Sequence, residues 1–64
     1  MEKRLAKLVA ELDKLAMNPS VYISSAEENL FDRGIKAPAY DSGVDEQLAY
    51  AEELRDEIRA CYQV

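Results

Sequence analysis

Mostly apolar residues recur with the 3.6-residue period of an α-helix over the last third of the chain. They fall within one arc of about 160° on a helical wheel: Val44, Gln47, Leu48, Tyr50, Ala51, Leu54, Ile58, Cys61 and Tyr62. Six carboxylates fall within the opposite arc, which is about 140° wide: Asp45, Glu46, Glu52, Glu53, Asp56 and Glu57. The pattern predicts a helix over about residues 43–62 that buries one face and exposes a row of acidic side chains.

Four leucines near the start of the chain are spaced three, four and three residues apart, as in the a/d seam of a coiled coil. They are Leu5, Leu8, Leu12 and Leu15, and they predict a helix over about residues 2–17. Two heptads are too short to hold an isolated helix together in water. The seam therefore needs a partner, which is the last helix, a second chain or both.

The segment between these two helices contains several turn and start signals. An Asn-Pro pair ends the first helix, and Ser24 or Ser25 can cap a short middle helix over about residues 25–33. Gly34 is placed to end that helix, and the residues after it are expected to form an extended strap. Ser42, with an acidic residue three positions later, resembles a capping box for the last helix.

The predicted fold is all-α, in a single domain over residues 1–64. We expect the first and last helices to pack antiparallel as a helical hairpin, with the middle helix and two extended straps across one end. A chain of 64 residues buries only about 60% of its unfolded surface, so its own core is marginal. We therefore expect two hairpins to pair as a homodimeric four-helix bundle. The predicted core and dimer contacts are Leu5, Leu8, Leu12, Leu15, Leu48, Ala51, Leu54, Ile58 and Cys61.

The content of cysteine and histidine limits how such a small core can be reinforced. Cys61 is the only cysteine, so no disulfide forms within the chain. The sequence has no histidine, and a lone thiolate leaves too few ligands for a zinc site. We expect no metal and no other cofactor. Self-association is then the remaining way to stabilise such a small core.

Charge and the first residues restrict the partners of the chain. With 8 basic and 13 acidic side chains, the net charge is −5. A conventional nucleic-acid binder has a basic patch, so direct binding to nucleic acid is disfavoured. The first residues are charged rather than apolar, which predicts neither a signal peptide nor a membrane span. Together with the single cysteine, this predicts a cytoplasmic location.

The acidic row of the last helix has two interpretations. It is a docking surface for a protein with a basic surface, or a set of carboxylates that imitates a phosphate backbone, and charge then steers association. Alternatively, it is an ordinary solvated face that keeps a small protein soluble.

Three aromatic residues of the middle segment form the second candidate site: Tyr22, Phe31 and Tyr40. Aromatic side chains dominate the energetics of many interfaces, so these are predicted anchors for a protein partner. The alternative is that the three rings cover the open end of the hairpin, whose core is small.

Catalysis is not predicted, because the chain has no histidine, no nucleophile with a visible base and no glycine-rich phosphate loop. The predicted function is a non-enzymatic protein-binding module, in its sharpest form a small acidic, phage-type inhibitor that mimics nucleic acid. One alternative is a structural module that only dimerises. Another is a small nucleic-acid regulator that contacts phosphates through the basic residues of the first helix, which are Lys3, Arg4, Lys7 and Lys14.

Overall fold

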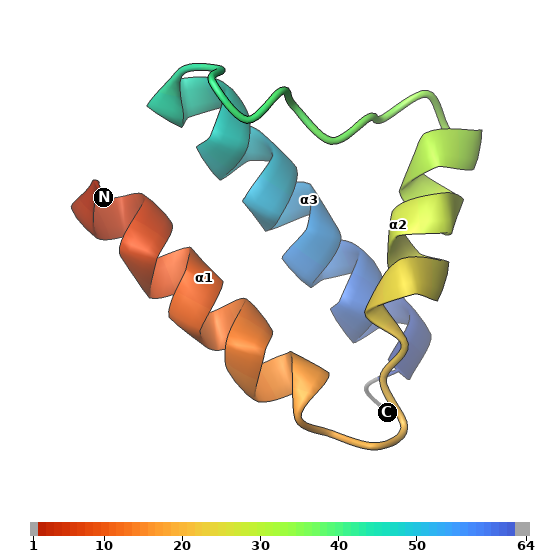
Figure 1. Ribbon diagram of the computed structural model, residues 1–64. Coiled ribbons are helices and arrows are strands. Elements are labelled where there is room, and N and C mark those ends of the chain that lie inside the picture. The colour runs from red at the N-terminus through yellow and green to blue at the C-terminus, as the bar shows by residue number, and fades with distance from the viewer. Residues whose placement is uncertain (1, 63–64) are drawn as a thin grey trace.

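The computed structural model describes residues 2–62 and contains three α-helices. They are α1 (Lys3–Ala16), α2 (Ile23–Asp32) and α3 (Val44–Tyr62), and an extended connector of residues 33–43 joins α2 to α3 (Figure 1). The described residues form no strand, so the prediction of an all-α fold is confirmed. The middle helix begins two residues earlier than predicted, and the other helix ends agree with the prediction to within one residue.

α3 lies between the other two helices and packs against both, whereas α1 and α2 hardly touch each other (Figure 1). The Cα atoms extend over 31, 25 and 15 Å along the principal axes, and a helix with its side chains is about 10–12 Å across. The molecule is therefore flattened along its shortest axis. Within residues 2–62, neither α3 nor any other helix combines the length and the apolar character that a membrane crossing requires.

α1 and α3 run parallel, which corrects the prediction of an antiparallel hairpin (Figure 1). Leu5 and Leu8, early in α1, pack with Ala51 in the first half of α3. Glu11, farther along α1, pairs with Arg59 near the end of α3. The cause is the middle helix. Because α2 carries the chain back along α3, the connector delivers it to the end of the molecule where α1 begins.

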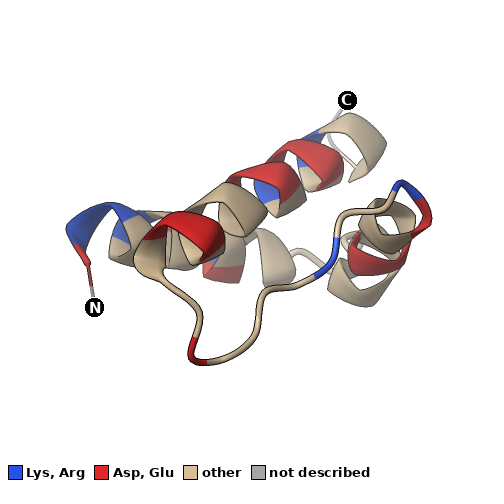
Figure 2. Cartoon of the chain, turned by 90° about the horizontal axis from the view of Figure 1, so that it is seen from above, with Lys and Arg blue, Asp and Glu red and all other residues tan. Residues whose placement is uncertain are grey.

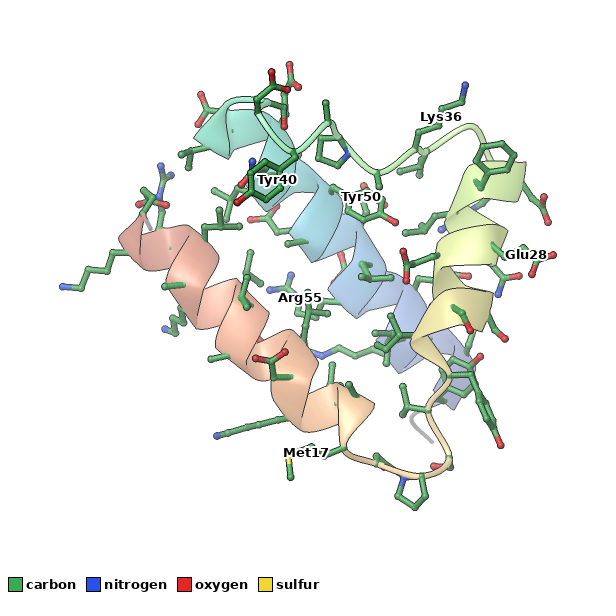
Figure 3. All side chains as sticks on the ribbon, viewed as in Figure 1. Met17, Glu28, Lys36, Tyr40, Tyr50 and Arg55 are labelled. Atoms are coloured by element: carbon green, nitrogen blue, oxygen red, sulfur yellow. The ribbon has the colours of Figure 1, made fainter. Side chains whose placement is uncertain are left out.

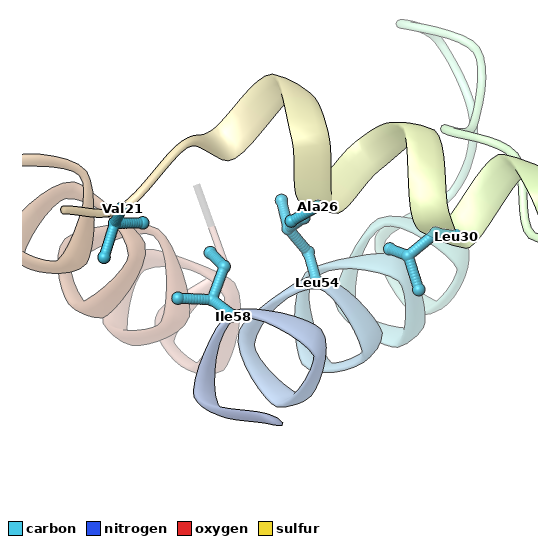
Figure 4. Close-up of a cluster of buried hydrophobic side chains, with 5 residues drawn as sticks. All are labelled: Val21, Ala26, Leu30, Leu54 and Ile58. Carbon is cyan, nitrogen blue, oxygen red and sulfur yellow. The ribbon is translucent and has the colours of Figure 1, made fainter. Parts of the chain in front are cut away.

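The core consists of two neighbouring clusters of buried apolar side chains. The larger cluster joins α2 and the turn before it to the second half of α3, through Val21, Ala26, Leu30, Leu54 and Ile58 (Figure 4). The smaller cluster joins α1 to the first half of α3, through Leu5, Leu8 and Ala51. Leu12 is half-buried and packs against both clusters, so the two form one continuous core.

Most of the predicted core residues are buried, but Cys61 is not. The buried ones are Leu5, Leu8, Ala51, Leu54 and Ile58, and the half-buried ones are Leu12, Leu15 and Leu48. Cys61 is exposed in the last turn of α3, so its assignment to the core was wrong. Its neighbours there are the polar side chains of Asn29 and Glu57. The apolar arc of the helical wheel is therefore wider than the face that α1 and α2 cover.

α2 supplies apolar surface that the prediction of a dimer assumed to be missing. Leu30 is completely buried and Val21 is only 8% exposed, and neither belongs to the two predicted helical stripes. Because α2 and the turn before it contribute these side chains, the single chain has a larger core of its own than the hairpin would have had. The prediction that two chains pair into a four-helix bundle is not tested by the structure of a single chain, but this larger core removes the main reason for it.

The ends of α2 are set by the backbone. Tyr22 occupies the N-cap position and no side chain bonds to the first amides of the helix, so Ser24 and Ser25 are not its caps. At the other end, Gly34 terminates the helix, as predicted, and this glycine has a φ angle of 84°. The amide of Gly34 donates to the Phe31 carbonyl, and the following amide donates to the Leu30 carbonyl, both at 2.9 Å. This pair of hydrogen bonds is the Schellman motif, which satisfies the last carbonyl groups of a helix.

The start of α3 is tied to the connector by Gln47 rather than by the predicted capping box. The side-chain amide nitrogen (Nε2) of Gln47 donates to the carbonyl oxygens of Tyr40 at 3.3 Å and Ser42 at 3.1 Å. The hydroxyl of Ser42 is buried and finds no hydrogen-bond partner within the described residues. The connector is therefore held against α3 by a side chain from the helix itself.

Candidate partner-binding surface

Five carboxylates of α3 are exposed on its solvent side, and we call them the acidic face: Asp45, Glu46, Glu52, Glu53 and Asp56. This side of α3 faces solvent because the opposite side carries Ala51, Leu54 and Ile58 into the core. Figure 2 shows acidic residues recurring along α3, whereas the N-terminal end of α1 is basic. The charge of the molecule is thus unevenly distributed.

Glu57, the sixth predicted carboxylate, ties the first residue of the connector to α3 instead of facing solvent. Its side chain is only 11% exposed, and it accepts a hydrogen bond from the Arg33 guanidinium at 2.8 Å. The Cys61 thiol also donates to it, at 3.5 Å. Partial shielding from water and then this contact with Glu57 raise the pKa of Cys61. Glu57 is therefore not part of the acidic face.

The two arginines of α3 are both engaged with carboxylates. The Arg55 guanidinium lies 3.3 Å from the Asp56 carboxylate, and Arg55 is itself half-buried. Arg59 pairs with Glu11 of α1. Within residues 2–62, no ion pair involves the remaining members of the acidic face, which are Asp45, Glu46, Glu52 and Glu53.

Two shallow grooves border the acidic face, and they differ in charge. The groove between α1 and α3 has a volume of about 360 Å³ and brings Glu52 near three cations, Arg4, Lys7 and Arg55. The other groove lies between the connector and α3, and we call it the connector groove. It has a volume of about 480 Å³ and is lined by Glu46 and Glu53 and by one cation, Lys36. The carboxylates with the least compensation therefore lie on the connector side.

The connector groove combines these carboxylates with apolar surface. Ile35 and Pro38 line it from the connector, and Ala49 and Tyr50 line it from α3. Figure 3 shows Tyr50 beneath the connector. Tyr50 is half-buried, and burial, followed by the nearby charge of Glu27, raises its pKa. The groove thus has an apolar floor and an acidic edge.

The apolar residues of the connector groove were not predicted as site residues. The sequence does place Glu46, Ala49, Tyr50 and Glu53 at positions i, i+3, i+4 and i+7, which share one side of a helix. Nothing in the spacing shows that the connector lies across that side. The groove depends on the course of the chain between α2 and α3.

The three predicted aromatic anchors are exposed, but the structure does not bring them together. Tyr22 is 61%, Phe31 60% and Tyr40 101% exposed, so the idea that they cover the end of a hairpin was wrong. Tyr22 packs edge-on against Tyr62, with ring centroids 6.3 Å apart. The Lys36 ammonium lies 5.8 Å from the Phe31 centroid. Because the rings have different surroundings, they do not form a common aromatic surface.

Within residues 2–62, no three side chains of His, Cys, Asp or Glu gather as a group that could hold a metal ion. Comparison with protein-family models, with curated proteins and with solved structures finds no match to this chain. What the geometry offers is negative charge on one side of α3 and a partly apolar groove beside it.

Proposed function

We propose that this chain is a non-enzymatic protein-binding module whose acidic face docks on a basic surface of another protein. The observation that carries the proposal is the exposure of five carboxylates along one side of α3. Four of these carboxylates have no ion pair within residues 2–62, so their charge is available to a partner. Charge of one sign on a rigid helix raises the rate of encounter with a complementary surface and selects against partners of the same sign.

An inhibitor that mimics nucleic acid is the sharpest form of this function. The acidic face runs from Asp45 to Asp56, which spans about 16 Å of helix axis at about 1.5 Å per residue. Its five carboxylates therefore occur about once every 4 Å on average, in two groups separated by about 9 Å along the axis. This mean density is close to one phosphate per about 3.4 Å of helix axis for one strand of B-DNA. A basic groove that binds a nucleic-acid strand would meet a similar density of negative charge on α3.

Affinity capture with matched charge variants tests this function. One variant neutralises the acidic face by Glu46→Gln, Glu52→Gln and Glu53→Gln. The control removes the same charge from exposed residues elsewhere, by Asp13→Asn, Glu28→Gln and Asp32→Asn. We expect the wild-type chain and the control to capture the same basic protein from a cell lysate, and the acidic-face variant to lose it.

Salt and competition complete the test. Raising the ionic strength to about 0.15 M or above should weaken the captured complex, because exposed charges are then screened beyond about 8 Å. A partner that normally holds nucleic acid should also be released by a competing DNA duplex. Capture that is equal for the acidic-face variant and the wild-type chain would refute the proposal. Equal losses in the two variants would show an effect of net charge alone and would refute it as well.

The two alternative functions remain predictions with less support. Lys3, Lys7 and Lys14 are exposed on α1, as a nucleic-acid regulator would require, but the net charge of −5 repels phosphates. A mobility-shift assay at low salt tests that function, because phosphate contacts are strongest there. A module that only dimerises requires a stable dimer, which sedimentation tests directly.

A further inference from the structure

The connector groove is the place where the acidic face meets exposed apolar surface. Pro38 lies on one side of it, and Ala49 and Tyr50 lie on the other. The small side chain of Ala49 leaves the groove open along α3. A groove of about 480 Å³ with this lining suits a single long side chain better than a whole helix or strand.

Two carboxylates of the groove are free to bind a cation. Glu46 and Glu53 are exposed, lie about 10 Å apart along the helix axis and have no ion pair within residues 2–62. The other carboxylates of α3 near arginines are already compensated: Asp56 by Arg55, and Glu57 by Arg33. The groove is therefore a place where a positive charge from outside the chain would meet two unpaired carboxylates at once.

Lys36 is the basic residue of this lining, and it forms no ion pair with Glu46 or Glu53. Lys36 points away from α3 in Figure 3, and its ammonium lies 5.8 Å from the centroid of the Phe31 ring. That distance is typical of a cation–π contact, and it places the ammonium beside Phe31, which does not line the groove. Glu46 and Glu53 thus remain unpaired within residues 2–62.

We propose that the connector groove receives an arginine side chain of the partner protein. Its aliphatic stem lies against Pro38 and Tyr50, and its guanidinium is held by the carboxylates of Glu46 and Glu53. Arginine fits this site better than lysine, because its guanidinium is planar, weakly hydrated and able to stack on an aromatic ring while it pairs with carboxylates. This inference rests on the proposed function, since it names the group of the partner that the acidic face binds.

An NMR titration of the uniformly ¹⁵N-labelled chain tests the site without the partner. The probe is the blocked tripeptide acetyl-Ala-Arg-Ala-amide, and its control contains citrulline, which has nearly the same shape without the charge. We expect the arginine peptide to shift the amide signals of residues 35–37, 39 and 46–53, and the citrulline peptide to shift none. Equal shifts with both peptides, or shifts spread over all carboxylate positions, would overturn the proposal.

Matched variants locate the binding within the groove. Ala49→Leu fills the groove, and Ala60→Leu adds the same group to another exposed alanine of α3 that does not line it. Ala49→Leu and the pair Glu46→Gln and Glu53→Gln should each weaken peptide binding about tenfold or more, as expected when a charge-assisted contact is lost. Ala60→Leu should leave it unchanged, and circular dichroism should show the same helix content for all variants. Unchanged binding by Ala49→Leu would refute the site.

The same variants separate this inference from the proposed function. If the captured protein is lost by the acidic-face variant but retained by Ala49→Leu, the acidic face binds a partner and the arginine site is wrong. If the arginine peptide binds in the groove but capture is insensitive to the acidic face, the arginine site holds and the proposed function is wrong. Loss of both the captured protein and the peptide in Ala49→Leu supports the two together.

Discussion

Leu30 and Phe31 are neighbours in α2 with opposite surroundings. Leu30 is completely buried against α3, whereas Phe31 is 60% exposed. We predict that Leu30→Ala lowers the free energy of unfolding by about 2–4 kcal/mol, because it removes buried methyl groups and leaves a cavity. A domain of this size has a total of only about 3–10 kcal/mol, so the loss is a large part of it.

Phe31→Ala is the control for this prediction. Its ring contacts the Lys36 ammonium at the surface, so its removal should cost less than about 1 kcal/mol. Urea unfolding followed by circular dichroism measures both variants. Similar losses for Leu30→Ala and Phe31→Ala would mean that α2 does not pack on α3 through Leu30.

Cys61 gives a prediction about pH. Thiols react as thiolates, and partial shielding together with Glu57 raises the pKa of Cys61, so its alkylation by iodoacetamide should follow a profile displaced to high pH. Glu57→Gln removes the neighbouring negative charge and lowers this pKa. Alkylation at pH 8 should therefore become faster, by about tenfold for each unit by which the pKa falls. At a pH above both pKa values, the two rates should converge.

The control for Cys61 is Asp56→Asn, which removes a carboxylate that does not contact the thiol. Its alkylation profile should match that of the wild-type chain. If Glu57→Gln leaves the profile in place as well, the contact between Glu57 and Cys61 does not govern the thiol.

The helical wheel predicts the environment of most residues of α3 but not that of Cys61 and Glu57. Acidic residues opposite an apolar stripe face solvent whichever helix packs on the stripe, so the acidic face follows from the spacing alone. Cys61 and Glu57 lie near the margins of the two arcs, where the neighbouring helix decides. α2 places Asn29 and Arg33 beside them, and no pattern within α3 contains that information.

At the scale of the elements, the end of α2 depends on a residue that adopts a positive φ angle. Gly34 has φ 84°, which costs an L-residue with a side chain about 1–2 kcal/mol. An added Cβ would meet no atom within 4 Å, so this cost comes from the backbone alone. We predict that Gly34→Ala destabilises the protein by about 1–2 kcal/mol, measured by urea unfolding.

Gly43 provides the matched comparison, since it directly precedes α3 and does not have a positive φ angle. Its carbonyl accepts the first helical hydrogen bond, from the Gln47 amide at 3.2 Å. Serine is a good N-cap residue, so Gly43→Ser should be neutral or stabilise by a few tenths of a kcal/mol. If Gly43→Ser lowered the free energy of unfolding more than Gly34→Ala, the positive φ angle of Gly34 would not be what makes glycine necessary at the end of α2.

The existence of all three helices could be predicted, but the groups that cap them could not. Periodic apolar residues and a glycine stop define a helix locally, so α1, α2 and α3 lie close to their predicted positions. Which groups cap a helix depends on the path of the chain just before that helix. Gln47 reaches the carbonyls of the connector only because the connector crosses above α3, and Ser42 is then left without the capping role its spacing suggested.

At the scale of the whole molecule, the direction of α1 relative to α3 could not be deduced from the two apolar stripes. Parallel and antiparallel packing bury the same leucines, so the stripes do not choose between them. The choice is made by α2, whose return along α3 requires Ala26 and Leu30 to face the core. The connector groove depends on this return, because it forms where the chain crosses back to begin α3.

At this scale, the packing bears most directly on the oligomeric state to be expected. Leu5 and Leu8 are buried within one chain, and two of the large exposed apolar side chains contact other groups of the same chain: Tyr22 packs on Tyr62, and Phe31 lies beside Lys36. Each copy also carries a net charge of −5, which opposes association at low salt. We therefore predict that sedimentation velocity at micromolar concentration, with a reductant to keep Cys61 as a free thiol, gives the monomer mass of 7.2 kDa. A mass that rises with concentration towards twice this value would contradict the prediction. It would mean that the half-buried side chains of Leu12, Leu15 and Leu48 are covered by a second copy, as the leucine spacing of α1 first indicated.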